Sequence, residues 1–476
     1  MSNPRQKQAE ASTGKPGPKV AKSKRASQRQ EIDHRVFQPN AAGIDIGARE
    51  IYVAVPADRD EHPVRKCETF TEDLHQMAEW LVSCGITTVA MESTGVYWIP
   101  VYDVVEQHGI QPCLVNPRNM KNVPGKRTDF HECQWIQHLH SMGLLHSAFR
   151  PDSDVCAVRS LMRHRNDLVE MASQHVQHMQ KALTQMNVQF HHVISDLTGL
   201  TGLAVLDAIV AGERDPAVLA KLRDPRVKAS EETIRKSLEG NWRSEQILVL
   251  KQRLSLYRSY RDQISDCDKE IEKLVAAFEP KADPEQKPMP EDRKQKQRRR
   301  KKKSGSPDFD MRTEAYKLFG VDLTHIPGLM MLVFMLFSEV GRDMSRWPTA
   351  AHFVSWLGLC PDNDISGGKV LWRGARRTKN RAGTLFRLAA HSLHRDPSPL
   401  GDYLRRMKAK LGPAAATTAT AHKIAIIFYT MLKRQVEYDA SLWAERDAMR
   451  EKRIETRLQK QAAQRGYKLV PLEAAA

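Results

Sequence analysis

Apolar and polar positions in the first third of the chain alternate with the short period of β-strands and then with the longer period of helices. The pattern predicts seven elements, in the order strand, strand, strand, helix, strand, helix, strand, at 43–46, 51–55, 64–70, 72–83, 87–91, 97–108 and 111–115. The first two runs flank Gly-Ala-Arg-Glu and are expected to pair as a hairpin. This order predicts an α/β domain with a mixed sheet over residues 40–150.

The middle of the chain has a helical period. Apolar residues recur every three or four positions in two stretches, at Val158, Leu161, Leu168, Met179 and Met186 and then at Ile247, Leu250, Leu254, Tyr257, Ile264, Ile271, Val275 and Phe278. Two polar residues interrupt each series, namely Arg165 and His175 in the first and Arg261 and Asp268 in the second. This spacing predicts two long helices in a domain at 151–280, packed as an antiparallel coiled coil or along a dimer seam. Short helices and loops are expected at 195–240.

The remaining segments differ in composition. Residues 1–36 show no hydrophobic period and are expected to form a disordered basic arm. The Pro-, Lys- and Arg-rich stretch 281–310 is expected to be a flexible basic linker. A mainly helical domain is predicted at 315–440, followed by a charged helix and tail at 441–476.

The charge of the chain indicates its partner. Its 74 Lys and Arg exceed its 57 Asp and Glu by a net charge of +17. Most of this excess lies in residues 1–36 and 281–303, so the folded body is only mildly basic. A polyanion, most commonly nucleic acid, is the partner that such segments favour, although solvated tails have the same composition.

Several classes of protein are excluded by the same survey. The longest apolar runs, 329–337 and 424–432, have nine residues each, which is too short for a membrane span. The N-terminal residues show no secretory signal, so we expect a cytoplasmic protein. The seven cysteines include no Cys-x-x-Cys pair, which favours reduced thiols over a disulfide framework or a structural zinc site.

Four carboxylates are candidates for a metal site. Asp45 lies in the first predicted strand and Glu92 at the end of the fourth, and ligands collect at the carboxyl ends of strands. Asp129 and Glu132 follow the fifth strand and share one face if a helix has begun there. Carboxylates gathered from separate elements repel one another without a cation, and their hard oxygens suit Mg²⁺. Each acid taken alone also fits an ordinary surface position.

The C-terminal domain contains Asp-Ile-Ser-Gly-Gly-Lys at 364–369. Its two glycines allow the backbone to approach a phosphate closely, and Ser366 becomes a nucleophile if its hydroxyl is activated. The cations that follow could stabilise an alkoxide and a phosphorane, whereas Ser-Gly is also a common turn. The residues expected at nucleic acid are Lys126, Arg127, Gly367, Gly368, Lys369, Arg373, Arg376, Arg377, Lys379 and Arg381.

Two weaker patterns remain. Ile-Pro-Gly at 326–328 and Glu-Val-Gly at 339–341 flank an apolar run and look like a helix-hairpin-helix, which offers backbone N–H groups to DNA phosphates. One predicted helix is crowded with His131, Cys133, His138 and His140, for which helix packing is a better explanation than zinc.

Five stretches carry a family resemblance. They are Gly-Ile-Asp-Ile-Gly at 43–47, Met-Glu-Ser-Thr-Gly-Val-Tyr-Trp at 91–98, Lys-Arg-Thr-Asp at 126–129 with Glu-Cys-Gln-Trp at 132–135, Trp-Leu-Gly-Leu at 356–359 and Ser-Gly-Gly-Lys at 366–369. Together they resemble the DEDD transposases of bacterial insertion sequences, in the insertion sequence 110 family and its 1111-like subgroup. His422 also matches a recurring feature of that family, without a role that the sequence defines.

The resemblance implies a fold, a site and partners. The N-terminal domain would be RuvC-like, a relative of RNase H, with Asp45, Glu92 and Asp129 binding Mg²⁺ at the scissile phosphate. Glu132 stands where the family usually has Asp, and its extra methylene moves that carboxylate outward. Ser366 would attack DNA and form a phosphoserine intermediate. The family also implies a tetramer, a dimer of dimers whose active sites combine domains of two subunits, and a bridge RNA that pairs with donor and target DNA.

The leading hypothesis is therefore a site-specific DNA recombinase that moves its own insertion sequence and works at the nucleoid. The first alternative is a RuvC-like, metal-dependent junction nuclease in which water attacks and Ser366 is incidental. The second is a non-catalytic nucleic-acid-binding protein with a degraded RNase H fold, for which Glu132 is the only hint.

Overall fold

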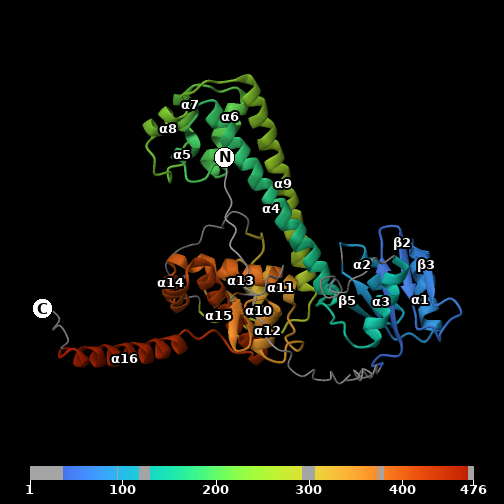
Figure 1. Cartoon of the computed structure of the whole chain (residues 1–476). Helices are drawn as coiled ribbons and strands as arrows, with labels where there is room; N and C mark the ends of the chain where they lie inside the picture. Colours follow the sequence, from blue (N-terminus) through green and yellow to red (C-terminus); the bar gives the residue numbers. More distant parts are fainter. Residues whose placement is uncertain are drawn as a thin grey trace, which may run out of the picture. The chain divides into compact units, whose positions relative to one another are not determined.

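The computed structural model describes residues 36–93, 95–116, 129–291, 306–372, 374 and 380–469 (Figure 1). By its internal contacts the chain divides into two compact units, Met1–Phe149 and Arg150–Ala476. Almost all of the predicted basic arm, and residues 292–305 of the predicted linker, lie outside the described residues.

The first unit is built on a mixed five-stranded sheet. Its strands are β1 (Ala41–Ile46), β2 (Glu50–Ala54), β3 (Val64–Glu68), β4 (Thr88–Glu92) and β5 (Gln111–Val115), in the spatial order β3-β2-β1-β4-β5. Strand β1 pairs antiparallel with β2 and parallel with β4, and β4 pairs parallel with β5. Gly47 N donates to Glu50 O over 2.9 Å and closes the predicted hairpin. The mixed sheet and its order of elements are confirmed.

Helices cover both faces of this sheet. They are α1 (Thr71–Ser83), α2 (Trp98–Gln107) and α3 (Asp129–Ser141). Alternate strand residues point to opposite faces, and Ile44 and Met91 pack in one core with α1 and α2. Ala90 and Cys113 point the other way and pack against Ile136 of α3. The α3 face is therefore the opposite face from that of α1 and α2.

The second unit begins with two long helices that run along each other in opposite directions (Figure 1). These helices, α4 (Ser153–Gln185) and α9 (Ser244–Ala276), have 33 residues each. The predicted apolar positions Leu168, Met179 and Leu250 are buried between them. The two long helices are confirmed, while their coiled-coil geometry stays a prediction.

Two of the polar residues that interrupt the apolar series are partners. Arg165 and Asp268 are both buried, and Nε and Nη2 of Arg165 donate to the two carboxylate oxygens of Asp268. Asp268 also accepts a hydrogen bond from Asp308 N over 3.1 Å. A buried charge needs a paired and hydrogen-bonded partner, so these residues define the alignment of α4 with α9.

Short helices occupy the segment between α4 and α9, as predicted. They are α5 (Phe190–Val193), α6 (Leu200–Ala211), α7 (Pro216–Lys221) and α8 (Glu231–Ser237). Their apolar residues share one core with α4 and α9, including Phe190, Leu206 and Ile234.

The C-terminal part is mainly helical, which confirms the prediction, and it contains one hairpin that the sequence did not predict. Its elements are α10 (Met311–Phe319), η3 (Leu323–His325), α11 (Val333–Val340), α12 (Ala350–Trp356), β6 (Asp364–Ser366), β7 (Lys369–Trp372), α13 (Arg381–Ser392), η4 (Leu393–Arg395), α14 (Pro399–Leu411), α15 (Pro413–Arg434) and α16 (Ser441–Gln464). Helix α15 contacts α12, α13 and α14 and forms the centre of this part. Arg163 of α4 donates to both carboxylate oxygens of Glu339 in α11, over 2.9 and 2.8 Å.

Three further sequence predictions can be compared with the structure. Residues 281–291, which composition assigns to a flexible linker, lie against α10, where Lys281 N donates to Lys317 O over 2.7 Å. The apolar run after the Ile-Pro-Gly turn becomes helical only at Val333, and its function as a helix-hairpin-helix stays a prediction. Within the described residues, no helix combines the length and the apolar character that crossing a bilayer requires.

Candidate active site

Asp45 and Glu92 occupy adjacent positions at the carboxyl ends of neighbouring parallel strands. Ile44 of β1 lies opposite Met91 of β4, so Asp45 and Glu92 are the next residues of the two strands. Ser93 fixes the end of β4, because its N and Oγ donate to Val115 O over 3.0 and 3.1 Å. The strands that carry the first two predicted acids are thus neighbours, as the sequence indicated.

The same alternation directs both acids to the α3 face. Residues two positions apart in a strand point to the same face of the sheet. Gly43 lies two residues before Asp45 and Ala90 two residues before Glu92, and both lie on the face that α3 covers. Asp45 and Glu92 therefore point to that face as well. A Cβ on Gly43 would stand only 2.2 and 2.4 Å from two backbone atoms of α3. Glycine at this position therefore lets α3 lie directly on β1 and brings its first turn toward Asp45.

The first turn of α3 supplies the other two acids. The helix begins at Asp129, and Glu132 follows in the same turn, which confirms the predicted helical spacing. Burial, followed by the negative charges of Glu132, Asp129 and Glu92, raises the pKa of Asp45 to about 6. The other three carboxylates are thus close enough for their charges to act on Asp45.

The donor set fits a hard divalent cation. Four carboxylates from two strands and one helix carry negative charge that a cation would neutralise, and carboxylate oxygens are preferred ligands of Mg²⁺. Among the described residues, however, no three His, Cys, Asp or Glu side chains are grouped closely enough to hold a metal ion as they stand. Strand register and the effect of the other three acids on the pKa of Asp45 support the prediction that the acids converge on one point. The described side chains do not form a complete set of metal ligands as they stand.

Of the predicted crowd on α3, Cys133 and His140 contribute to packing, whereas His131 and His138 are exposed. Cys133 is fully buried, its thiol donates to Phe130 O, and burial raises its pKa to about 12. His140 is buried too, with its Nε2 2.9 Å from the hydroxyl of Thr88. The contact of His140 with Thr88 joins α3 to the sheet, so the packing interpretation fits the two buried residues.

Ser366 lies at the tip of the hairpin β6–β7. It pairs with Lys369 across a two-residue turn in which Gly367 and Gly368 have φ values of 56° and 76°. Positive φ at both central positions is the geometry of a type I′ turn, which glycine adopts without strain. The hydroxyl of Ser366 is therefore presented on an exposed, tightly turned hairpin.

The chain segment before this hairpin is held by side chains from α13 and α15. Three successive donors reach carbonyl oxygens of the Trp-Leu-Gly-Leu stretch 356–359: Asn380 to Trp356 at 3.1 Å, Arg387 to Gly358 at 2.8 Å, and His422 Nδ1 to Leu359 at 3.2 Å. Gly383 completes the contact, because a Cβ there would stand 2.3 Å from Leu357 O. This stretch is thus an anchor for the segment that leads to Ser366.

Asn380 and Arg387 are site-supporting residues that the sequence analysis missed. Asn380 also caps α13, since its Oδ1 accepts from Gly383 N over 2.9 Å, and an Asn immediately before a helical pattern is a recognisable N-cap signal. Arg387 carries no such signal, because its acceptor lies 29 residues away in the chain. For His422 the structure provides a contact, its bond to Leu359, where the sequence offered none.

The predicted nucleic-acid contacts are only partly described. Lys126, Arg127, Arg373, Arg376, Arg377 and Lys379 lie outside the described residues. Lys369 is exposed on β7 next to the turn, and Arg381 is exposed at the first position of α13. These two cations remain candidates for phosphate contact.

Comparison with known proteins defines the class. Residues 42–188 match a transposase family, the DEDD type of IS110, and residues 322–404 match the transposase IS116/IS110/IS902 family. No curated protein matches the chain. The chain is therefore a transposase in its general role, a DNA-binding enzyme that cleaves and recombines DNA. The domains that it carries are those of IS110-family transposases, one on the acid cluster and one on the region around Ser366.

Proposed function

We propose that the chain moves an insertion sequence as a site-specific recombinase, with Ser366 as the nucleophile. The observation that carries this proposal is the position of Ser366, an exposed hydroxyl beside a type I′ turn, within the C-terminal transposase match. Ser366 pairs with Lys369, which places a cation next to the turn, where developing charge on a phosphate needs stabilisation.

The proposed chemistry balances without an external energy source. The Ser366 oxygen forms a bond to phosphorus while the bond from phosphorus to a deoxyribose oxygen breaks, and the serine proton ends on the departing oxygen. In the joining step a DNA hydroxyl attacks the phosphoserine and the proton returns to Ser366. One phosphate ester is exchanged for another in each step, so the bond is conserved.

In the same proposal, Asp45, Glu92, Asp129 and Glu132 hold Mg²⁺ at the scissile phosphate. The bound ion would polarise the phosphate and stabilise the charge that develops on it. The charge crowding around Asp45 and the DEDD transposase match support this assignment. The strand order β3-β2-β1-β4-β5, with an acid on β1 and another at the end of β4, supports a RuvC-like domain.

The partners of the proposed recombinase are donor and target DNA, a bridge RNA and further copies of the chain. A dimer of dimers would let the acids of one subunit act with Ser366 of another. The resemblance in sequence supports these partners, and the two separate transposase matches support a site built from two domains.

A covalent-adduct assay tests the proposal. The full-length protein is incubated with its bridge RNA, labelled DNA carrying the element's ends, and Mg²⁺, then denatured and separated. We expect a DNA-linked protein band that Ser366→Ala abolishes and that Ser355→Ala, at an exposed serine of α12, retains. Loss of the band in Asp45→Asn would place the acids in the same reaction.

The alternatives predict different outcomes. Cleavage that persists in Ser366→Ala but is lost in Asp45→Asn would identify a nuclease in which water attacks. Binding of DNA without cleavage, in the presence of guide and cation, would identify a non-catalytic protein. Either result contradicts the serine mechanism.

A further inference from the structure

The second half of helix α16 presents its side chains to solvent. From Glu451 to Leu469, every described side chain is exposed except the half-buried Ala462. An isolated helix of this kind derives little stability from packing, so its surface is available for a partner.

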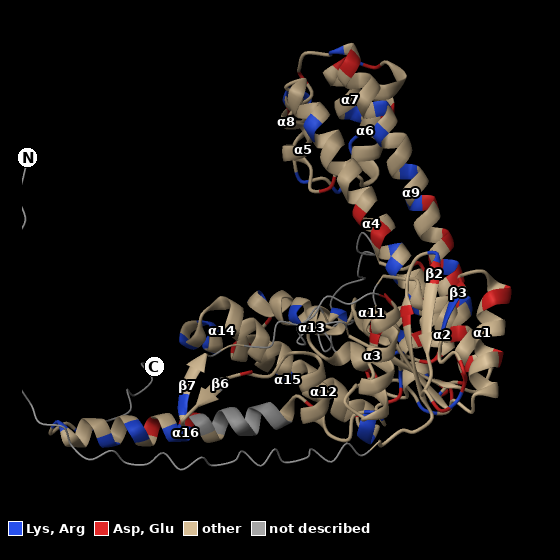
Figure 2. Cartoon of the chain, turned by 45° about the vertical axis from the view of Figure 1, so that its right-hand side comes forward, with Lys and Arg blue, Asp and Glu red and all other residues tan. Residues whose placement is uncertain are grey.

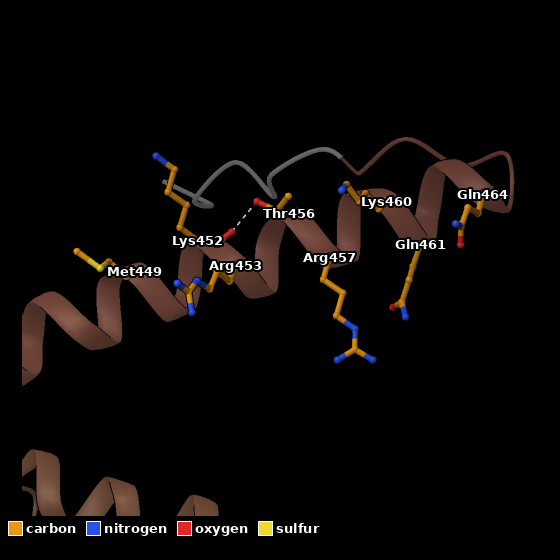
Figure 3. A pocket seen from close by; sticks show the side chains of 8 residues that line it. All are labelled: Met449, Lys452, Arg453, Thr456, Arg457, Lys460, Gln461 and Gln464. Carbon is orange, nitrogen blue, oxygen red and sulfur yellow. Dashed lines mark hydrogen bonds between the residues drawn. The ribbon is translucent and has the colours of Figure 1, made fainter.

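Cations gather on one side of this helix. Arg453, Arg457 and Lys460 follow at helical spacings of four and three residues, which places them on one face, and Lys452 lies beside them. They line a shallow hollow along the helix (Figure 3). We call Lys452, Arg453, Arg457 and Lys460 the basic face of α16.

From residue 451 onward, the acids of the helix lie away from the two arginines. Glu451 and Glu455 are one turn apart and, by the period of 3.6 residues, point away from Arg453 and Arg457. The sequence contains no Asp or Glu between 456 and 469, whereas the same stretch has four Lys or Arg residues. Figure 2 shows Lys and Arg as the prevailing charged residues toward the end of α16. Positive charge on the basic face is thus left for an external anion.

The spacing of the basic face fits a phosphate backbone. With a rise of about 1.5 Å per residue, Arg453 and Lys460 lie roughly 10 Å apart along the axis. Duplex DNA presents about one phosphate charge per 1.7 Å of its axis, so several phosphates lie within that span. The basic face contains no aromatic side chain, and binding of single strands relies on aromatic stacking. Arginine favours phosphate because its planar fork donates two hydrogen bonds.

We propose that the basic face of α16 binds the phosphate backbone of duplex DNA, independently of base sequence. The site lies outside both transposase matches, which end at residues 188 and 404. This site does not involve Ser366 or the four acids. A failure of this proposal can therefore be distinguished from a failure of the proposed chemistry.

The test measures binding of the full-length protein to a labelled duplex of about 30 base pairs, roughly 100 Å long, over a series of salt concentrations. The variant Arg453→Gln, Arg457→Gln, Lys460→Gln removes three charges from the basic face. The control Lys236→Gln, Lys269→Gln, Lys273→Gln removes three charges from exposed lysines of α8 and α9. Circular dichroism verifies that both variants remain folded with equal helix content.

We expect the basic-face variant to bind the duplex about ten- to a hundredfold more weakly at physiological salt. The slope of the logarithm of the binding constant against the logarithm of the salt concentration should be smaller in magnitude by about two to three. The control should lose less than about threefold, since its lysines pair with acids on their own helices. Equal losses in the two variants, or no loss in the basic-face variant, overturn the proposal. So does a loss confined to duplex RNA of the same length, which would assign the basic face to RNA.

Discussion

Arg387 of α13 donates from Nη2 to the main-chain oxygen of Gly358 over 2.8 Å, and so holds the stretch that leads to the Ser366 hairpin. Arg387 is half-buried, and burial lowers its pKa. Replacing Arg387 with Met removes the donor but keeps the aliphatic stem, and it leaves the Gly358 carbonyl unpaired. We expect a loss of about 1–3 kcal/mol in the free energy of unfolding, measured by urea denaturation.

Arg381→Met is the control for this prediction, because Arg381 is exposed at the start of the same helix. Its stability should change by less than about 0.5 kcal/mol. The Arg387→Met protein, assayed below its unfolding transition, should also form less DNA-linked protein, since the hairpin is less firmly held. Two variants of equal stability would show that the Arg387 bond does not anchor the segment.

The contact of Gly43 with α3 leads to a second prediction. Gly43→Ala places a methyl group 2.2 Å from the backbone of α3, so the helix must shift away from β1. Such overpacking costs about 1–3 kcal/mol, and the shift moves Asp129 and Glu132 relative to Asp45. We expect Mg²⁺ or Mn²⁺ to raise the melting temperature of the parent protein but not that of this variant.

Gly109→Ala separates this effect from backbone strain. Gly109 has a φ of 77°, but within the described part of the chain no atom lies within 4 Å of the added Cβ. This control loses about 1 kcal/mol through its left-handed conformation and should keep the response to divalent cations. If Gly43→Ala responds to cations as the parent does, the close packing of α3 on β1 is not needed for the metal site.

The burial of Asp45, together with the acids around it, gives a prediction for the metal-free protein. Its pKa of about 6 in the folded state exceeds the ordinary value of 3.8, so the folded state binds the proton more tightly. Stability from this group is complete below about pH 3.8 and is lost as the pH rises toward 6. Asp45→Asn removes the loss and should stabilise chelator-treated protein at pH 7.5 by about 1–2 kcal/mol.

The measurement is the difference in melting temperature between Asp45→Asn and the parent, followed from pH 4.5 to 8 in chelator. The difference should grow up to about pH 7 and then stay constant. Asp58→Asn is the control, since the Asp58 side chain is largely exposed and lies 3.6 Å from Arg59. A flat difference for Asp45→Asn would show that burial and the neighbouring acids do not raise the pKa of Asp45 in the folded protein.

The sequence predicted those features that depend on local periodicity. Alternation at 43–46 and the helical pattern at 72–83 reflect which side chains face a core, and the neighbourhood of Asp45 and Glu92 follows from the order of strands. Arg165 and Asp268 were interpreted as polar interruptions because their pairing spans 103 residues. Partners so distant in sequence are visible only once the helices are aligned.

The candidate serine site was predicted by composition but not by shape. The glycine pair was interpreted as a close approach to phosphate, although Gly-Gly between two short apolar stretches is also a hairpin signal. Ile365 and Leu371 are 62% and 71% exposed, so the hairpin lacks the buried alternation that marks a strand. The anchoring donor Arg387 was missed, and His422 was named without a role, because they lie 29 and 63 residues from the carbonyl oxygens that they bind.

The turn beside Ser366 supports a prediction in which conformation alone is changed. Gly367 has a φ of 56°, and no atom of the described residues lies within 4 Å of an added Cβ, so a substitution there meets backbone strain without a clash among those residues. Asn adopts positive φ more readily than other residues, whereas a β-branched residue does so rarely. We expect Gly367→Asn to retain most of the DNA-linked product and Gly367→Val to lose at least tenfold, because about 1.4 kcal/mol of strain corresponds to that factor.

The control for this prediction is that Gly367→Asn and Gly367→Val have equal overall stability. A difference in adduct formation then reflects the turn between Ser366 and Lys369 rather than unfolding. Because the hairpin is exposed, neither substitution should shift the melting temperature by more than a few degrees. Adduct formation that follows the φ preference of the residue, Gly above Asn above Val, indicates that the turn aims the hydroxyl. If Val forms as much adduct as Asn, the position of Ser366 is set by bound DNA instead, and the type I′ geometry is not required for attack.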